Sequence, residues 1–266
     1  MPELKGNLNK MLSKATDPVE YHLPIGDERI ALNPLIGAKA EIEYTGKIHC
    51  KACGSKTKKS FGQGYCYPCF MSVPETAPCI LHPEKCEAHK GIYRDKAFAE
   101  NHCLQAHYVY LAVTAGLKVG VTRQTQIPTR WIDQGAVKAI KLAKTPNRHI
   151  AGLIEVSLKK HIADKTSWQK MLKNDIETDI KLREEKEKAK GLLDEEFKKY
   201  LTFDKKITKI NYPIKEYPQK VTALNLDKTA TVSGTITGIK GQYIFFDTER
   251  VINIRKFSAY EVFFRF

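Results

Sequence analysis

Two Cys-x-x-Cys pairs constrain the fold of this chain more than any other feature of its sequence. Cys50 and Cys53 form the first pair, and Cys66 and Cys69 form the second pair after a gap of twelve residues. Four thiolates at this spacing are typical of a zinc ribbon, in which the pairs share one tetrahedral ion. A redox role is the alternative, but it requires only one such pair. The sequence therefore predicts a zinc-ribbon-like segment.

The loop between the two pairs is basic and contains an aromatic residue. Lys56, Lys58 and Lys59 precede Phe61. Such a loop can contact a nucleic-acid backbone and stack on a base. It can equally be a solvated turn, so the sequence leaves both alternatives open.

A second group of thiol and imidazole side chains follows, in the order Cys79, His82, Cys86, His89, His102, Cys103 and His107. Cys86 and His89, together with Cys103 and His107, have the spacing of a second zinc site. Cys103 and His107 share one face if the chain between them is helical. Cys79 is the candidate replacement for one of these ligands. The alternative is a set of buried thiols and surface histidines.

The charge of the chain favours a polyanionic partner. The 266 residues include 44 Lys and Arg against 30 Asp and Glu, which gives a formal net charge of +14. Lys and Arg that neutralise phosphates release condensed counterions, so we expect a nucleic acid as partner, DNA in preference to RNA. A basic protein without such a partner is the alternative.

Cysteine content and hydropathy indicate the cellular compartment in which the protein is expected. The seven cysteines are an odd number and include two Cys-x-x-Cys pairs, which suits reduced thiolates on metal better than a disulfide framework. The sequence contains no signal-peptide-like run at its start and no stretch of 18 apolar residues. We therefore expect a cytoplasmic protein without a membrane partner.

The middle of the chain predicts a hairpin followed by two helices. Residues 108–113 and 117–122 are rich in β-branched, aromatic and aliphatic residues and are separated by Thr114-Ala115-Gly116, which predicts two antiparallel strands. Helical spacing then recurs in two stripes, the first opening near Arg130. The stripes are Trp131, Ile132, Ala136, Ala139, Ile140 and Ala143, and then Ile150, Leu153, Ile154, Leu158 and Ile162.

This arrangement resembles the GIY-YIG nuclease domain. Val109-Tyr110-Leu111 matches the first signature, Lys118-Val119-Gly120 matches the second, Arg130 lies on the next helix, and Glu155 lies on a later one. The resemblance covers about the middle third of the chain. Lysine stands where a tyrosine is usual in the second signature, as in a phage-associated branch of the superfamily, and the first signature lacks its glycine. The whole chain also resembles an uncharacterised prokaryotic family of unknown function that joins a Cys-rich segment to this core.

The resemblance implies a set of roles. In that family a tyrosine of the first strand helps to activate water, the arginine contacts the scissile phosphate, and the glutamate holds one divalent cation. The corresponding candidates are Tyr108 or Tyr110 for water, Lys118, Arg123 and Arg130 for phosphate charge, and Glu155 for Mg²⁺ or Mn²⁺. A free tyrosine has a pKa of about 10, so a base near neutrality requires a shift of about 3 units, or roughly 4 kcal/mol. The alternatives are ordinary strand tyrosines and a solvated or ion-paired glutamate.

The last part of the chain predicts a β domain. Residues 221–266 are rich in Val, Ile, Thr, Phe and Tyr and are divided by glycines, which predicts four or five short strands in a small antiparallel barrel or sandwich. Residues 30–48 also read as strands and could complete the same sheet. Lys240 beside Tyr243 could suit nucleic-acid contact, and the alternative is that the aromatic residues here form the core.

Together these observations predict an α+β protein. The expected segments are 1–48 with strands, 49–106 with zinc ligands, 107–210 with the GIY-YIG-like core of a small antiparallel sheet and flanking helices, and 218–266 with the β domain. The first functional hypothesis is a metal-dependent nucleic-acid phosphodiesterase with one or two structural zinc sites. The alternatives are a non-catalytic, zinc-containing nucleic-acid-binding protein with a degenerate nuclease fold, and a zinc-stabilised scaffold for another protein.

Overall fold

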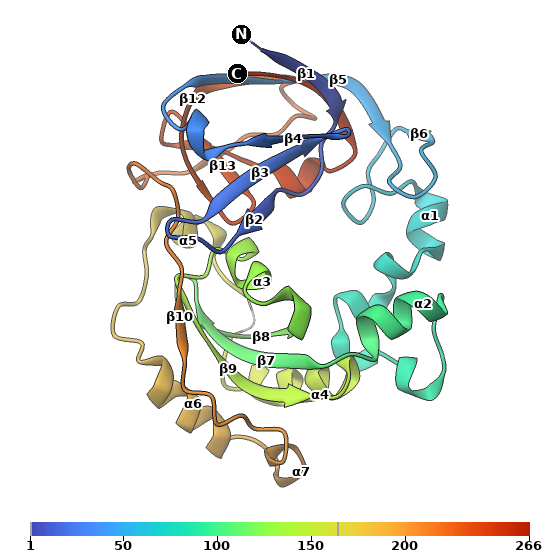
Figure 1. Ribbon diagram of the computed structural model, residues 1–266, viewed down its shortest axis with the longest axis vertical. Helices are drawn as coiled ribbons and strands as arrows, with labels where there is room; N and C mark the ends of the chain where they lie inside the picture. Colours follow the sequence, from blue (N-terminus) through green and yellow to red (C-terminus); the bar gives the residue numbers. More distant parts are fainter. Residues whose placement is uncertain (1, 164) are drawn as a thin grey trace. The chain divides into compact units, whose positions relative to one another are not determined.

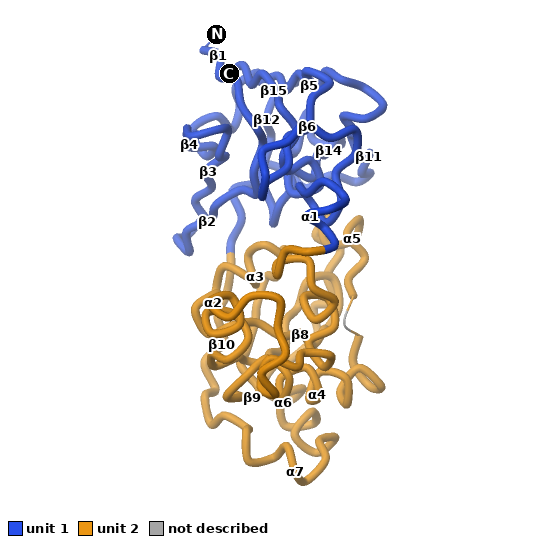
Figure 2. The backbone as a smooth tube through the Cα atoms, turned by 90° about the vertical axis from the view of Figure 1, so that its right-hand side faces the viewer, with its two compact units in different colours: residues 1–71, 211–266 blue, residues 72–210 orange. Residues whose placement is uncertain are grey.

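The computed structural model of the protein describes residues 2–163 and 165–266 and has an α+β fold (Figure 1). The chain forms two compact units (Figure 2). Unit 1 comprises residues 1–71 and 211–266, and unit 2 comprises residues 72–210. The Cys-rich segment expected at 49–106 is therefore divided between the two units.

Unit 1 contains a large sheet built from both ends of the chain (Figure 1). Its order is β1 (Glu3–Asn7), β15 (Tyr260–Arg265), β5 (Lys39–His49), β12 (Thr231–Lys240), β13 (Tyr243–Phe246), β14 (Arg250–Asn253) and β11 (Thr222–Ala223), with β6 (Lys56–Thr57) on β5. The strands are antiparallel except β11, which runs parallel to β14. The sheet is open among the described strands, with β1 and β11 at its ends.

A smaller sheet of β2 (Leu12–Lys14), β3 (Glu20–Ile25) and β4 (Glu28–Ala31) completes unit 1. Alternate residues of β3 are buried, and the hydroxyl of Tyr21 accepts a hydrogen bond from the backbone N–H of Gly241 (3.1 Å). The side-chain amide of Gln242 bonds both backbone groups of Met11 (2.9 and 3.0 Å). These bonds fasten the small sheet to the β12–β13 turn, as in a sandwich.

Unit 2 is organised around a sheet of β10 (Ile207–Lys209), β9 (Lys138–Thr145), β7 (His107–Val113) and β8 (Leu117–Arg123). The hairpin predicted from the sequence is confirmed as β7 and β8. One face of β7 packs on α4 (Arg148–Lys159) and α6 (Leu182–Gly191), and the other lies toward α3 (Thr129–Asp133) (Figure 1). The shared core is Val109, Leu111, Val113, Val119, Ile140, Leu142, Ala151, Ile154 and Leu158, with further residues of α6 and α7.

The prediction of a helix from near Arg130 through Ala143 is wrong beyond the first turn. The helix ends as α3 at Asp133, and Gly135 follows with a φ of 71°, a left-handed conformation that favours glycine. The chain then enters β9, so Ala139, Ile140 and Ala143 are strand residues. The helix expected around Ile154 is confirmed as α4.

The remaining elements are short. The helices are α1 (Tyr67–Ser72), α2 (Lys96–Phe98), α5 (Trp168–Lys173) and α7 (Glu195–Lys198), and the π-helical turn η6 (Ala99–Cys103) extends α2. The 3₁₀ turns are η1 (Asn33–Leu35), η2 (Pro74–Thr76), η3 (Pro78–Ile80), η4 (Pro83–Lys85), η5 (Ala88–Lys90), η7 (Gln124–Gln126) and η8 (Ile254–Phe257). Since the helical segment ends at Cys103 and His107 begins β7, the two residues do not share a helix face.

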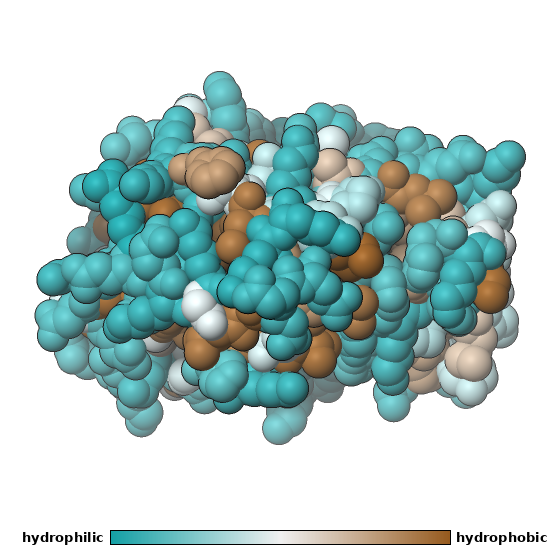
Figure 3. Space-filling view, turned by 90° about the horizontal axis from the view of Figure 1, so that it is seen from below, coloured by the Kyte–Doolittle hydropathy of each residue, from teal (hydrophilic) through white to brown (hydrophobic). Residues whose placement is uncertain are grey.

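The helices of unit 2 carry many charged side chains. On α6, ion pairs three residues apart join Lys188 to Glu185 and Lys190 to Glu187. Hydrophilic side chains predominate on the face drawn in Figure 3. Over residues 2–163 and 165–266, no helix combines the length and the hydropathy needed to cross a membrane.

Candidate functional site

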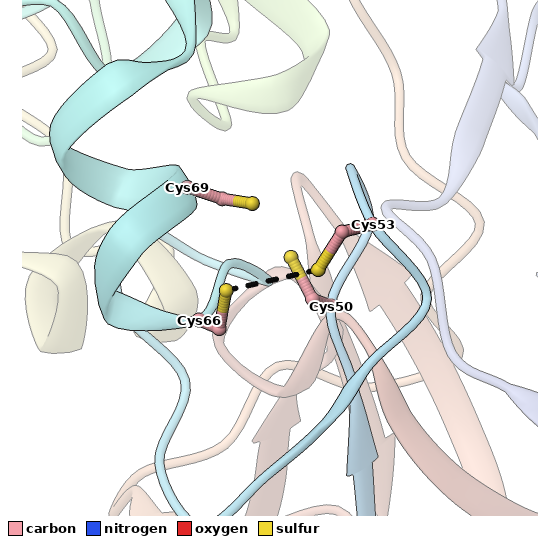
Figure 4. A group of neighbouring side chains, drawn as sticks. All are labelled: Cys50, Cys53, Cys66 and Cys69. Carbon is pink, nitrogen blue, oxygen red and sulfur yellow. Dashed lines mark hydrogen bonds between the residues drawn. The ribbon is translucent and has the colours of Figure 1, made fainter.

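The two Cys-x-x-Cys pairs of unit 1 converge on one point (Figure 4). The four Sγ atoms of Cys50, Cys53, Cys66 and Cys69 all lie within 4.8 Å of one another, and Cys53 Sγ is 3.8 Å from Cys66 Sγ. Tetrahedral zinc with Zn–S bonds of about 2.3 Å places its sulfurs about 3.8 Å apart. This cluster can therefore hold a metal ion such as zinc.

The backbone shapes the first knuckle of this cluster. Gly54 has a φ of 70° and its N–H donates to the carbonyl of Cys50 (2.8 Å), while the N–H of Cys50 donates to the carbonyl of Ser55 (2.9 Å). Burial raises the pKa of the Cys50 thiol. Hydrogen bonds from the backbone N–H groups of Cys66, Cys53 and Ala52 outweigh this effect and lower the pKa to about 6. Hydrogen bonds to sulfur thus favour the thiolate, which is the form that binds metal.

The loop between the two Cys-x-x-Cys pairs turns its aromatic residue inward. The ring of Phe61 contacts those of Tyr67 and Phe70, with centroid distances of 5.3 and 6.0 Å. Lys59 Nζ lies 5.6 Å from the Phe61 centroid, and Lys58 is exposed. Phe61 therefore packs within the segment itself, and the solvated-loop interpretation fits this part better than base stacking.

A second cysteine cluster lies in unit 2. The Sγ atoms of Cys79, Cys86 and Cys103 lie within 4.8 Å of one another, so this cluster too can hold a metal ion. His89, expected as a ligand, is not in this group, because its ring stacks on that of His149 at 4.4 Å. Cys79, the replacement ligand considered above, is therefore found in the position expected for His89.

His107, the other expected ligand, is not in this group either, and it is fully buried at the start of β7. Its Nδ1 lies 2.7 Å from the carbonyl oxygen of Gln105 and donates to it. Its Nε2 has no hydrogen-bond partner among the described residues. Burial lowers the pKa of His107 to about 4, so the ring is neutral near pH 7.

Three of the expected catalytic residues, Tyr108, Tyr110 and Lys118, share one face of the hairpin. Cross-strand pairs place Tyr110 opposite Gly120 and Ala112 opposite Lys118, so these side-chain positions lie on the same face as Tyr108. Lys118 is buried there, and Gly120 provides no side chain to cover Tyr110. The alternation along β7 directs Val109 and Leu111 into the core on the opposite face.

The hydroxyl of Tyr110 is linked to Arg130 through Gln134. With its amide oriented to satisfy both neighbours, Gln134 donates to Tyr110 Oη (2.7 Å) and accepts from Arg130 Nη2 (3.1 Å) and Nε (3.2 Å). Arg130 and Gln134 are one helical turn apart, on α3 and just after its end. The sequence contained no signal for Gln134, because its role depends on the turn that ends α3.

Glu155 of α4 also acts on this hydroxyl. Burial raises the pKa of Tyr110 to about 12, with Arg130 opposing the shift and Glu155 adding to it. The carboxylate is largely buried, and its Oε2 lies 3.5 Å from Lys159 Nζ. Arg130 and Glu155 are therefore each within electrostatic reach of the Tyr110 hydroxyl. The ion-paired interpretation of Glu155 also holds.

Tyr108 is more accessible than Tyr110 and lies beside two lysines. Lys141 Nζ and Lys144 Nζ of β9 are 5.0 and 5.9 Å from the centroid of the Tyr108 ring. Lys144 is exposed, whereas Lys141 is half-buried and 3.3 Å from the carboxylate of Asp204. The sequence analysis missed both lysines because it assigned β9 to a helix.

Two other expected contacts lie elsewhere. Arg123 pairs with His107 in the hairpin, on the face opposite to Tyr110, and its Nη1 donates to the carbonyl of Asn101 (3.3 Å). Arg123 therefore does not belong with Tyr110. Lys240 is fully buried in unit 1, with Nζ 5.4 and 5.0 Å from the ring centroids of Tyr212 and Tyr217, so it is not a surface contact for nucleic acid.

Comparison with known proteins yields one family. A family profile described as "Protein of unknown function (DUF2797)" matches residues 37–262. No curated protein and no solved structure matches the chain. The matched range includes both cysteine clusters and the hairpin with its flanking helices.

Proposed function

The chain belongs to the DUF2797 family of proteins of unknown function, and from that premise we propose that it is a metal-dependent nucleic-acid phosphodiesterase of the GIY-YIG type. The observation that carries the proposal is that hydrogen bonds through Gln134 link the hydroxyl of Tyr110 to Arg130, while the charge of Glu155 adds to the raised pKa of Tyr110. These groups come from β7, α3 and α4, in the chain order that the GIY-YIG resemblance implies. Convergence of a phenol, a guanidinium and a carboxylate from three elements supports a shared role in phosphate chemistry.

Arg130 is the candidate for binding the scissile phosphate. A guanidinium offers a planar fork that matches two phosphate oxygens, and it stabilises charge that develops on them. Gln134 holds the Nε and Nη2 edge of Arg130, which fixes the plane of the guanidinium. Gln134 is thus a positioning residue, and Tyr110 fixes the amide of Gln134 in turn.

Tyr108 is a better candidate than Tyr110 for contact with the attacking water. Tyr110 is fully buried and its pKa is raised to about 12, so its hydroxyl remains protonated near neutral pH. Tyr108 is half-exposed on the same face, and the ammonium groups of Lys141 and Lys144 beside it attract a phosphodiester. Lys118 occupies the position of the second family tyrosine and can contribute only its charge.

Glu155 is the candidate ligand for a catalytic Mg²⁺ or Mn²⁺. Magnesium commonly uses one or two carboxylates together with water and substrate phosphate, so a single carboxylate fits when nucleic acid is bound. Such an ion would supply electrophilic stabilisation of the phosphate. The ion pair of Glu155 with Lys159 opposes cation binding, and Lys159 has to move away from the carboxylate first.

Zinc is the metal that we assign to the four-thiolate cluster of unit 1. The ligand set is all sulfur and closed, which is typical of structural rather than catalytic zinc. For the partner we propose nucleic acid, DNA in preference to RNA, because of the net charge of +14 and the lysines beside Tyr108. Reduced thiolates on metal suit the cytoplasm.

The test is a cleavage assay with single-stranded, duplex and branched DNA and RNA in Mg²⁺ or Mn²⁺. We expect metal-dependent cleavage that falls by about 100-fold or more in Arg130→Ala and Glu155→Gln, since each removes charge stabilisation at the phosphate. Glu187→Gln on α6 is the matched control, because it removes an exposed carboxylate and leaves the site intact. A wild-type protein that cleaves none of these substrates, or a Glu155→Gln variant as active as wild type, would refute the proposal.

A second candidate is a nucleic-acid-binding protein that does not cleave. The full burial of Tyr110 and the lysine at position 118 favour it, because both weaken the case for a competent base. This candidate predicts binding that weakens steeply with salt and does not require Mg²⁺. Binding of this kind without cleavage of any substrate would select it over the phosphodiesterase.

A further inference from the structure

We propose that His107 Nε2 closes the cysteine cluster of unit 2 into a second metal centre, with Cys79, Cys86 and Cys103 as the other three ligands. The ion that suits this set is zinc, for which three thiolates and one imidazole form a closed structural site. This centre is independent of whether the protein cleaves nucleic acid.

The hydrogen bonding of His107 supports a ligand role. Its Nδ1–H donates to the carbonyl of Gln105 at 2.7 Å, which leaves the lone pair on Nε2. Nε2 is buried without a hydrogen-bond partner among the described residues, and such a group destabilises a folded protein. Metal-bound histidines commonly donate their other ring N–H to a carbonyl in this way. Binding a metal would satisfy the one polar atom of His107 that the fold leaves unpaired.

The surroundings of the cluster suit its charge. Three thiolates and a neutral imidazole on Zn²⁺ carry a net charge of −1, after the three thiol protons have been released to water. Arg148 donates to the carbonyls of Cys79 (2.8 Å) and Ile80 (2.9 Å), and its charge acts on Cys86. Arg123 acts on Cys103. Two guanidinium groups thus stand beside a centre of negative charge, which accounts for the position of Arg123.

The centre joins three segments of unit 2. Cys79 and Cys86 lie in the loop around η4, Cys103 ends η6, and His107 starts β7. The loop also packs on α4 so closely that a Cβ at Gly152 would lie 2.1 Å from the backbone nitrogen of Glu84. The metal therefore fixes the start of β7, and with it Tyr108, relative to the loop that contacts α4.

An open fourth position is the competing arrangement. A cavity of about 360 Å³ borders the three cysteines and is lined by Ile92, Tyr93 and Phe98 among others. Water or an added small ligand could reach the metal from it, as in zinc sites with three protein ligands. No ring nitrogen of His107 lies within 4.8 Å of all three sulfurs in the structure, so coordination requires the ring and the thiolates to draw together around the ion. The burial and the unpaired Nε2 of His107 favour imidazole over the open arrangement.

The first test uses the wild-type protein and requires no variant. Zinc analysis should give two ions per chain, and X-ray absorption should show on average three and a half sulfur and one half nitrogen ligand per zinc, with imidazole outer-shell scattering. Sulfur with oxygen and no imidazole signal would overturn the assignment of His107, and one zinc per chain would overturn the second centre.

Variants then test the residue itself. His107→Ala should weaken the second zinc by at least on the order of 100-fold in chelator competition, because even second-shell changes cost about 10–100-fold. His107→Cys restores a fourth ligand and should retain two zinc ions. The control is His89→Ala, which removes a histidine of the same region that lies outside the cluster and should also retain two. Unchanged affinity in His107→Ala, or loss of the second zinc in His89→Ala alone, would overturn the proposal.

Discussion

The hydroxyl of Tyr110 occupies the space in which Gly120 would carry a side chain. An ideal Cβ at Gly120 would lie 2.6 Å from Tyr110 Oη and 2.7 Å from Cζ, distances that real Cβ atoms essentially never show. The two residues are direct partners across the β7–β8 ladder. The glycine of the second signature is thus required by the phenol of the first.

We expect Gly120→Ala to destabilise unit 2 by about 1–3 kcal/mol, the usual cost of overpacking a filled site. Urea unfolding followed by tryptophan fluorescence measures this, since both tryptophans, Trp131 and Trp168, belong to unit 2. Gly191→Ala is the control: within the described residues a Cβ there meets no atom within 4 Å. That variant should be unchanged or up to about 1 kcal/mol more stable. Equal stability of Gly120→Ala and wild type would contradict the packing argument.

Lys240 should make the stability of unit 1 depend on pH. Burial lowers its pKa from 10.5 to about 7, although the rings of Tyr212 and Tyr217 favour the charged form. Between these pKa values the unfolded chain holds one more proton than the folded chain, so stability rises with pH. Below pH 7 both states are protonated and this contribution is constant.

The rise from pH 7 to pH 9 should be no more than about 3 kcal/mol, at 1.36 kcal/mol per unit. Urea unfolding followed by circular dichroism at the two pH values measures it in wild type and in Lys240→Met, which should lack the rise. Lys228→Met is the control, because Lys228 is exposed. If Lys240→Met gains as much stability with pH as wild type, Lys240 remains charged in the fold.

Lys144 should contribute to nucleic-acid affinity through charge alone. It is exposed beside Tyr108, on the face proposed to meet the phosphodiester. Each phosphate contact adds about 0.9 to the slope of log affinity against log salt on duplex DNA, so Lys144→Gln should lower the slope by about this amount. Lys188→Gln is the control, since Lys188 pairs with Glu185 on α6. Equal slopes for the two variants would show that Lys144 does not contact nucleic acid.

Removal of metal from the four-thiolate cluster should release its loop. The loop is held by the two cysteine pairs and by the short pairing of β6 with β5, in which Ile48 lies opposite Thr57. Structural zinc contributes on the order of 10 kcal/mol in small modules, so a chelator or Cys69→Ser should expose Lys58 and Lys59 to trypsin. Mass spectrometry locates the cuts.

The control for this experiment is Cys79→Ser, which alters the cluster of unit 2 and should leave the loop around Lys58 protected. Cleavage at the same rate before and after chelation would show that the loop does not depend on metal.

The sequence was sufficient where a residue pattern had only one structural solution. The cysteine spacing around Cys50 led to the observed cluster, and the two apolar runs separated by Gly116 led to the hairpin. Both features are local, because the relevant partners lie close together in the chain. The burial of Phe245, Phe246 and Phe264 also followed from composition.

The sequence was misleading at β9, for a physical reason. This strand lies between β7 and β10 and is covered on both faces, so apolar residues occupy both sides and the two-residue alternation is lost. The spacing of Ala136, Ala139 and Ala143 then mimics a helix. Lys141 and Lys144 were missed with the strand.

The second cysteine cluster was expected from the sequence, but its complete set of ligands could not be chosen. Cys79 and His89 are both near Cys86 in the chain, and spacing alone allowed either to be a ligand. The choice depends on the stacking of His89 on His149, which is 60 residues away in the sequence. The burial of the Tyr110 side chain could not be predicted from the sequence either, because it depends on packing against α3 and Gly120.

The pairing of β5 with β12 and β15 has a consequence for synthesis of the protein. On the ribosome, Lys39–His49 emerge long before Thr231–Lys240 and Tyr260–Arg265, the strands that flank them in the finished sheet. Residues 72–210 can fold in the interval, while both edges of β5 remain unpaired with β12 and β15. A nascent chain that stalls before β12 would therefore present an unpaired strand, a surface that chaperones bind and that promotes aggregation.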